Sequence, residues 1–233
     1  AVGAKSQLNA TTGEFNTSLG SLSMGVGVVT GDNNVALGYQ ALENVTSGSS
    51  NIMMGAFAGH GLTGGANNVG VGHGALQVED ANGNNVAVGH LALSTLNAGA
   101  DAYNVAMGFQ AARLVSTGVQ NVIIGGFAGD AITTATSNVA IGYESLSTED
   151  TMGTAVAIGY RALKTQNSGS AAYNVALGYD TGKAVTTGVQ NALIGGLAGA
   201  ALTTGQGNVA VGYQALNDET TGGQNVAIGS AAL

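Results

Sequence analysis

The stretch Asn34–Gly38, Asn-Val-Ala-Leu-Gly, decides the fold because close variants of it recur along almost the whole chain. Aligned on the final glycine, successive copies are separated by seventeen or nineteen positions. Three steps of seventeen and one of nineteen make a higher period of seventy, which takes Gly38 to Gly108 and Gly178. Self-similarity at a fixed period is the signature of a repeat architecture. The aligned glycines are Gly38, Gly55, Gly72, Gly89, Gly108, Gly125, Gly142, Gly159, Gly178, Gly195, Gly212 and Gly229.

This short period is too small for a helix–turn–helix repeat, which needs roughly 33 residues or more. The Val-Ala-Leu segment before each glycine alternates in side-chain size as a short strand does, and Gly, Ser, Thr and Asn between the segments are typical of turns. We therefore predict an all-β fold, a parallel β-solenoid (β-roll or β-helix) of about 13 coils of 17–19 residues. Its coils should stack about 4.8 Å apart. We expect residues 16–233 to form this repeat domain and residues 1–15 to be an N-terminal lead-in or linker.

The composition excludes several classes of function. The chain has 233 residues with 40 Gly, no Pro and no Cys, and only 8% of its residues are charged. A net charge of −8 argues against nucleic acid as a partner, because that affinity depends on Lys and Arg. Without Cys there is no disulfide framework and no thiolate metal site. No apolar run is long enough for a transmembrane helix, so we expect no membrane insertion.

Counted from the aligned glycine, position −4 is Asn in eleven of the twelve repeats. Amides stacked one coil apart can form a hydrogen-bonded ladder, and Asn tolerates the left-handed backbone of tight corners. We interpret this column as structural, with a looser corner at Ala155, where the ladder is interrupted. The predicted ladder is Asn34, Asn51, Asn68, Asn85, Asn104, Asn121, Asn138, Asn174, Asn191, Asn208 and Asn225.

Positions −3 and −1 carry the larger aliphatic residues, and side chains alternate between the two faces of a strand. We therefore expect these two positions to point into the coil and position −2 to face outward. Position −2 is never polar, and a long exposed apolar stripe indicates a partner surface. We predict a homo-oligomer, most simply a parallel trimer, that associates through Ala36, Met53, Ala87, Ala106, Ile123, Ala140, Ala157, Ala176, Leu193, Ala210 and Ala227.

Position +1 is rich in aromatic rings. A column of rings at coil spacing is usually a packed ladder, but it can also stack on sugar rings. The possible glycan contacts are Tyr39, Tyr143, Tyr160, Tyr179 and Tyr213.

The sequence offers only weak candidates for a metal-binding or catalytic motif. His73 and His90 occupy equivalent positions one coil apart, which raises the alternative of a shared metal, but no Asp or Glu accompanies them in that column. No Ser/His/Asp set, Cys nucleophile or isolated carboxylate pair stands apart from the repeat. We therefore expect no catalytic residues, no metal and no cofactor, and we expect that the chain is not an enzyme.

Two families share the repeat motif. The element Asn-Val-Ala-Ile-Gly, at Asn138–Gly142 and Asn225–Gly229, resembles the head repeats of trimeric autotransporter adhesins. The longer phrase at Asn34–Leu42, and its near copy at Asn208–Leu216, looks more like the stalk repeats of bacteriophage tail fibres. The resemblance covers residues 16–233 and implies trimeric β-solenoid fibres that mediate attachment.

These observations favour a structural fibre protein, an elongated and trimeric rod that mediates or supports attachment to a cell surface. We expect it in a virion as part of a tail fibre, with a cell-surface glycan or protein as a possible receptor. The alternatives are a bacterial surface adhesin or extracellular filament subunit, then an ice- or glycan-binding solenoid. A glycan depolymerase would need carboxylates clustered in a groove between chains.

Overall fold

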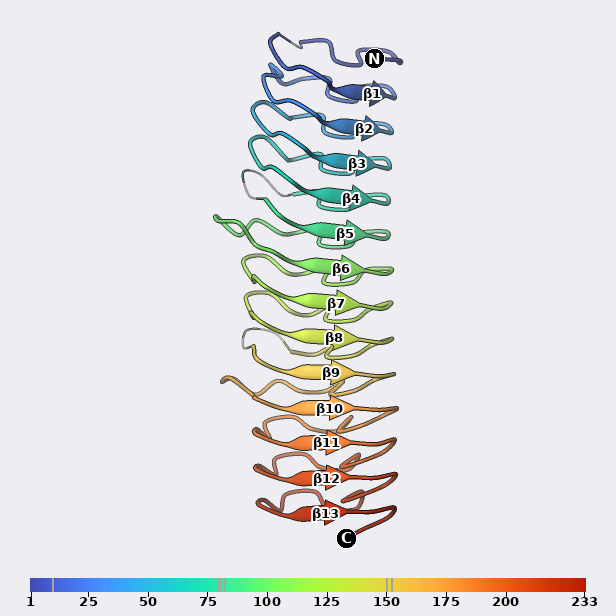
Figure 1. The fold of residues 1–233 in the computed structure, drawn as a ribbon, viewed down its shortest axis with the longest axis vertical. Coiled ribbons are helices and arrows are strands. Elements are labelled where there is room, and N and C mark those ends of the chain that lie inside the picture. The colour runs from blue at the N-terminus through green and yellow to red at the C-terminus, as the bar shows by residue number, and fades with distance from the viewer. Residues whose placement is uncertain (10, 79–80, 82, 150, 152) are drawn as a thin grey trace. The chain divides into compact units, whose positions relative to one another are not determined.

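The computed structural model describes residues 1–233 except residues 10, 79, 80, 82, 150 and 152. All strands found in the described residues are three residues long, and each belongs to one coil of a parallel β-solenoid (Figure 1). The predicted fold class is therefore confirmed. The strands are β1 (Thr17–Leu19), β2 (Val35–Leu37), β3 (Ile52–Met54), β4 (Val69–Val71), β5 (Val86–Val88), β6 (Val105–Met107), β7 (Val122–Ile124), β8 (Val139–Ile141), β9 (Val156–Ile158), β10 (Val175–Leu177), β11 (Ala192–Ile194), β12 (Val209–Val211) and β13 (Val226–Ile228).

The chain divides into two compact units, residues 1–119 with β1–β6 and residues 120–233 with β7–β13. Within each unit the strands pair in parallel and in sequence order. Equivalent residues of the repeat lie side by side, as with Val139 beside Val156 in β8 and β9. The two-residue expansions that contain Tyr103 and Tyr173 therefore leave the strand register unchanged, because the extra residues lie outside the strands.

The N-terminal segment contributes more to the solenoid than expected. The backbone N–H of Val2 donates to Ser18, and its carbonyl accepts from Gly20, which makes a parallel bridge between Val2 and Leu19. The backbone N–H of Gln7 likewise donates to Ser23. Gly3 lies one repeat length before Gly20 and has a similar positive φ. Val2 and Gln7 therefore pair with the coil of β1.

The aligned glycine is required by both backbone conformation and space. Gly125 has a φ of +136°, which L-residues rarely adopt, and a Cβ placed on it would lie 2.5 Å from the carbonyl oxygen of Gly142 in the next coil. Other aligned glycines have φ values close to this one. The repeat keeps glycine here because the next coil leaves no room for a side chain.

Gly125→Ala should lower the free energy of unfolding by about 3 kcal/mol, because backbone strain and a steric clash act together. Gly169→Ala is the matched control, since Gly169 also has a positive φ, +64°, but has nothing within 4 Å of a built Cβ. It should lose only about 1–2 kcal/mol. Urea titration followed by circular dichroism measures both variants, and equal losses would refute the steric argument.

The strands face the opposite way from our expectation. Position −2 is fully buried, as Ala36, Ala140 and Ala157 show, while the flanking positions −3 and −1 are half-buried or exposed. The whole predicted oligomer stripe therefore lies in the core: Ala36, Met53, Ala87, Ala106, Ile123, Ala140, Ala157, Ala176, Leu193, Ala210 and Ala227. It cannot be a partner surface while the coil is intact.

The reason for this inversion is the narrow interior of the coil. The opposite wall supplies the bulk, from an alanine at position +3 and a leucine at +4, such as Ala162 and Leu163, both fully buried. Alanine at −2 fills what remains. Side-chain size alone therefore does not reveal which strand face is buried in so thin a core.

The second coil of each seventy-residue block supports this packing. In that coil the residue at position −2 has a large side chain, and the residue at position +4 is glycine. A Cβ on Gly129 would lie 2.9 Å from Ile123, and one on Gly59 would lie 2.8 Å from Met53. The large and small residues have exchanged walls, which keeps the core volume constant.

Candidate functional site

The outer face of the strands is a regular apolar surface in each unit. Its two columns, positions −3 and −1, are apolar in all twelve aligned repeats. Val175 is 39% exposed and Leu177 is 45% exposed, although both lie in the middle of a unit. A contiguous exposed apolar surface is typical of a partner site. We call this surface the strand face. It carries the exposed apolar side chains that we had expected at position −2.

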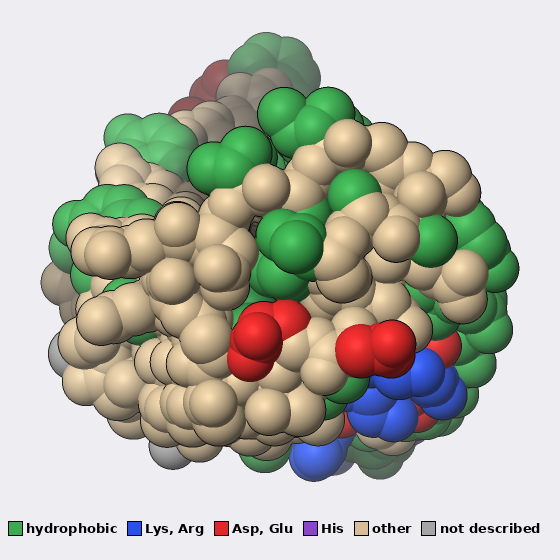
Figure 2. All heavy atoms as spheres, turned by 90° about the horizontal axis from the view of Figure 1, so that it is seen from below, with side chains coloured by type: hydrophobic (Ala, Val, Ile, Leu, Met, Phe, Trp, Pro, Cys, Tyr) green, Lys and Arg blue, Asp and Glu red, His purple; other side chains and the backbone are tan. Residues whose placement is uncertain are grey.

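The ion pairs of the second unit lie elsewhere, in the turns after β8, β9 and β10. In Figure 2 the visible basic groups lie beside acidic groups at the lower right, and further acidic groups lie at the top. Arg161 binds Asp180 of the next coil with two hydrogen bonds of 2.9 and 3.0 Å, and Lys183 lies 3.1 Å from the same carboxylate. The hydrogen bond to Asp180 raises the pKa of Arg161. These pairs lie at positions +2 and +5, so the charges are kept away from the strand face.

The predicted Asn column lies at the corner before each strand and is buried throughout except at Asn225, which is half-buried. Its side chains do more than bond to one another. Asn191 Oδ1 accepts from both the backbone N–H and the side-chain amide of Asn208, at 3.0 and 3.1 Å. Asn191 Nδ2 donates to Gly205 and to Asn174. Each amide therefore satisfies buried backbone groups as well as its neighbours, which fits a structural role.

The gap at Ala155 is filled by a residue that the sequence pattern did not reveal. Gln166 is fully buried, accepts a 2.7 Å hydrogen bond from Asn174 through Oε1, and donates a 2.8 Å bond to the buried Glu149. One block earlier in the sequence, the equivalent pair is Asn85 and Leu96. The earlier block thus has its amide at the corner, at Asn85, and the later block has it on the opposite wall, at Gln166. The looser corner that we expected at Ala155 is instead bridged by hydrogen bonds.

This exchange predicts energetic coupling between positions 155 and 166. Gln166→Leu alone should cost about 2 kcal/mol, because it removes two buried hydrogen bonds, one of them to a carboxyl group. Ala155→Asn alone should be neutral or destabilising, because it adds a second amide beside Asn174. The double variant restores the arrangement of Asn85 and Leu96, so it should recover about 1 kcal/mol relative to the sum of the single changes. Urea titrations of the four proteins measure this, and additive effects would contradict it.

The aromatic column follows the strand face directly. Tyr143, Tyr160 and Tyr179 stack nearly parallel, with ring centroids 5.6 and 5.1 Å apart. The other two predicted glycan contacts, Tyr39 and Tyr213, are about half exposed. Parallel stacking covers the ring faces and leaves their edges in solvent. Sugar stacking on the middle of the column is therefore obstructed by the neighbouring rings.

One coil in each of the first two blocks supplies its ring from a different position, which the sequence alignment missed. Phe57 and Phe127 come from position +2, one residue after the column. Phe57 packs against Tyr39 and His73 at 5.4 and 5.5 Å. Phe127 meets Tyr143 at 6.0 Å with an angle of 87° between the rings. Tyr143 therefore meets Phe127 edge to face on one side and stacks on Tyr160 on the other.

His73 and His90 are stacked with centroids 5.3 Å apart and an angle of 15° between the rings. Nitrogens of parallel stacked rings point sideways and not toward a common ion. In the part of the chain that is described, no three His, Cys, Asp or Glu side chains are grouped to hold a metal. The two histidines thus occupy ring positions of the aromatic column.

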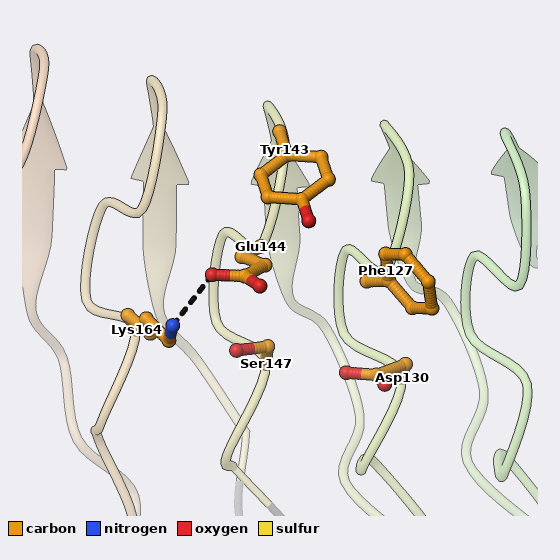
Figure 3. A pocket seen from close by; sticks show the side chains of 6 residues that line it. All are labelled: Phe127, Asp130, Tyr143, Glu144, Ser147 and Lys164. Carbon is orange, nitrogen blue, oxygen red and sulfur yellow. Dashed lines mark hydrogen bonds and ion pairs between the residues drawn. The ribbon is translucent and has the colours of Figure 1, made fainter.

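A hollow of about 340 Å³ opens beside the perpendicular ring pair, in the second unit (Figure 3). Phe127 and Asp130 come from the turn after β7, Tyr143 and Glu144 from the turn after β8, and Lys164 from the turn after β9. Ser147 completes the lining. Lys164 Nζ lies 2.5 Å from Glu144. The Glu144 carboxylate, followed by desolvation, raises the pKa of the Tyr143 phenol.

Comparison with known proteins assigns no family to this chain. No family model, no curated protein and no solved structure matches the chain. The site must therefore be interpreted from its own residues. Within the described residues, no helix of a length and apolarity suited to crossing a membrane occurs.

Proposed function

We propose that this protein is a structural fibre subunit, a rod of three parallel copies that supports attachment to a cell surface, as the shaft of a viral tail fibre does. The observation that carries the proposal is the strand face. Each unit presents two apolar columns along its aligned repeats, and the ion pairs of Arg161 and Lys164 lie away from them, in the turns after the strands.

The occupant of this surface is a second copy of the chain. A partner that covers many coils must present matching groups at the coil spacing of about 4.8 Å. A parallel copy has that spacing in every coil, including the register across the longer repeats. Symmetric homo-oligomers are also the commonest protein assemblies.

Three copies use both columns of the strand face. One column can meet its equivalents around a threefold axis while the other packs against the adjacent copy. The same geometry would suit a bacterial surface adhesin or extracellular filament, which is the second candidate and which the motif also resembles.

Electron microscopy of the purified chain tests the proposal. Slender particles with a threefold cross-section are expected. Compact particles that contain one chain would contradict it. Immunogold labelling of virions and of bacterial surfaces separates the two settings, because only one of them should carry the label.

A further inference from the structure

We propose that the hollow lined by Phe127, Asp130, Tyr143, Glu144, Ser147 and Lys164, which we call the ring groove, binds a saccharide ring. This names a partner class for the attachment function proposed above and rests on that function for its biological setting. The groove itself is formed within the second unit of one chain.

The first argument is the lining. Its volume, about 340 Å³, falls in the lower part of the range of roughly 300–1,000 Å³ typical of small-molecule sites. Phe127 and Tyr143 supply apolar ring surface to the lining, and the other face of the Tyr143 ring stacks on Tyr160. Sugar rings present an apolar C–H face that suits aromatic side chains, and hydroxyl groups that need both donors and acceptors.

The second argument is the mixture of polar groups. Carboxylates accept hydrogen bonds, the Lys164 ammonium donates them, and the Ser147 hydroxyl and the protonated Tyr143 phenol do both. In Figure 3 the Tyr143 hydroxyl points toward Glu144, and Asp130 lies below Phe127, so rings and polar groups surround one space. A polyhydroxylated ligand uses all of these groups together.

The third argument favours a neutral sugar over a cationic ligand. Two carboxylates beside two rings would also suit an organic ammonium ion, through ionic and cation–π attraction. However, Lys164 already pairs with Glu144 at 2.5 Å, so an added cation would meet a positive charge there. A neutral ligand faces no such repulsion.

The fourth argument comes from the repeat itself. One block later in the sequence, a hollow of about 390 Å³ again includes positions +2 and +5. There Leu197 replaces Phe127, Ala200 replaces Asp130 and Asn217 replaces Ser147. The fold thus tolerates a version of this groove without the phenylalanine ring and with fewer charges. The residues of the ring groove are not dictated by the solenoid.

This internal copy supplies a binding-deficient variant that should fold. The variant carries the residues found one block later: Phe127→Leu, Asp130→Ala, Glu144→Gln and Ser147→Asn. A control makes the same kind of exchange at two residues of the corner before the strands, Ser137→Gly and Thr154→Gln. Both variants keep the strand face and the core unchanged.

The probes are the methyl pyranosides of glucose, galactose and mannose, with putrescine as the cationic comparison. Saturation-transfer NMR on the full chain should detect at least one pyranoside, with a Kd in the roughly millimolar range expected of a single sugar ring. The four-residue variant should lose at least tenfold in affinity, and the control should bind as the native chain does. Binding of putrescine alone, no signal from any pyranoside, or equal affinity in the four-residue variant would overturn the inference.

The mass of the same samples in solution separates this inference from the proposed fibre function. Pyranoside binding by a single chain would support the ring groove and contradict self-association. An oligomer that binds no pyranoside would contradict only the ring groove.

Discussion

Charges of alternating sign placed on three consecutive coils of the strand face, Val139→Lys, Val156→Glu and Val175→Lys, should convert the proposed oligomer into folded single chains. These three residues are direct neighbours in β8, β9 and β10. Opposite charges on adjacent coils attract within one chain, whereas parallel copies in register bring like charges together. Each charge left unpaired in an apolar interface costs several kcal/mol. We therefore expect the dissociation constant to rise by a factor of about 10³ or more.

Sedimentation velocity and circular dichroism together measure this result. The matched control puts the same charges at the preceding corner, as Ser137→Lys, Thr154→Glu and Tyr173→Lys, where the native side chains are exposed or half-buried. The control should keep the native mass. An unchanged mass in the strand-face variant would show that copies do not associate through this surface.

The second large effect is a difference in stability between substitutions at two adjacent residues. Val156 is half-buried on the strand face, whereas Ala157 is fully buried in the core. Ala157→Lys should unfold the second unit, because a long charged side chain enters a space that holds a methyl group. Val156→Lys should leave the coil folded. We expect Ala157→Lys to cost about 5 kcal/mol or more, at the exceptional end of single substitutions.

Circular dichroism and limited proteolysis distinguish these two outcomes. Ala157→Lys should lose β signal and become protease-sensitive, while Val156→Lys should retain both the signal and the resistance. The reverse pattern would restore the orientation that the sequence had suggested, with position −2 facing outward.

The periodicity of the sequence was sufficient to predict the architecture. The aligned glycines locate the coils of β2 to β13, and the Asn column marks the corner of all but one of them, because a stacked coil needs a side-chain-free position and a corner amide at fixed places. Gly125 and Asn191 illustrate the two requirements. These demands come from the backbone and are therefore visible in each repeat.

The orientation of the strands could not be obtained in the same way. Alternation shows that Val156 and Ala157 lie on different faces, but it does not say which face is inside. Larger residues usually mark the core, and that rule failed because the opposite wall, with Leu163, fills most of the coil. The exchange between Ile123 and Gly129 was the available signal, since a large residue at −2 coincides with a glycine at +4.

The groove and the Gln166 bridge required three-dimensional information for a similar reason. Phe127 is one residue out of register with the aromatic column, yet its ring meets Tyr143. Gln166 belongs to a different column from Ala155, yet it bonds to the ladder residue Asn174. Neither contact follows from aligning equivalent positions, because each joins different positions of the repeat.

The mass of the native chain in solution tests the central claim most directly. Sedimentation equilibrium over a wide range of concentrations should give three times the mass of one chain. A twofold mass would retain the strand face as the contact and contradict the threefold arrangement. A single-chain mass at every concentration would contradict the claim that the apolar strand face is covered by further copies of the same protein.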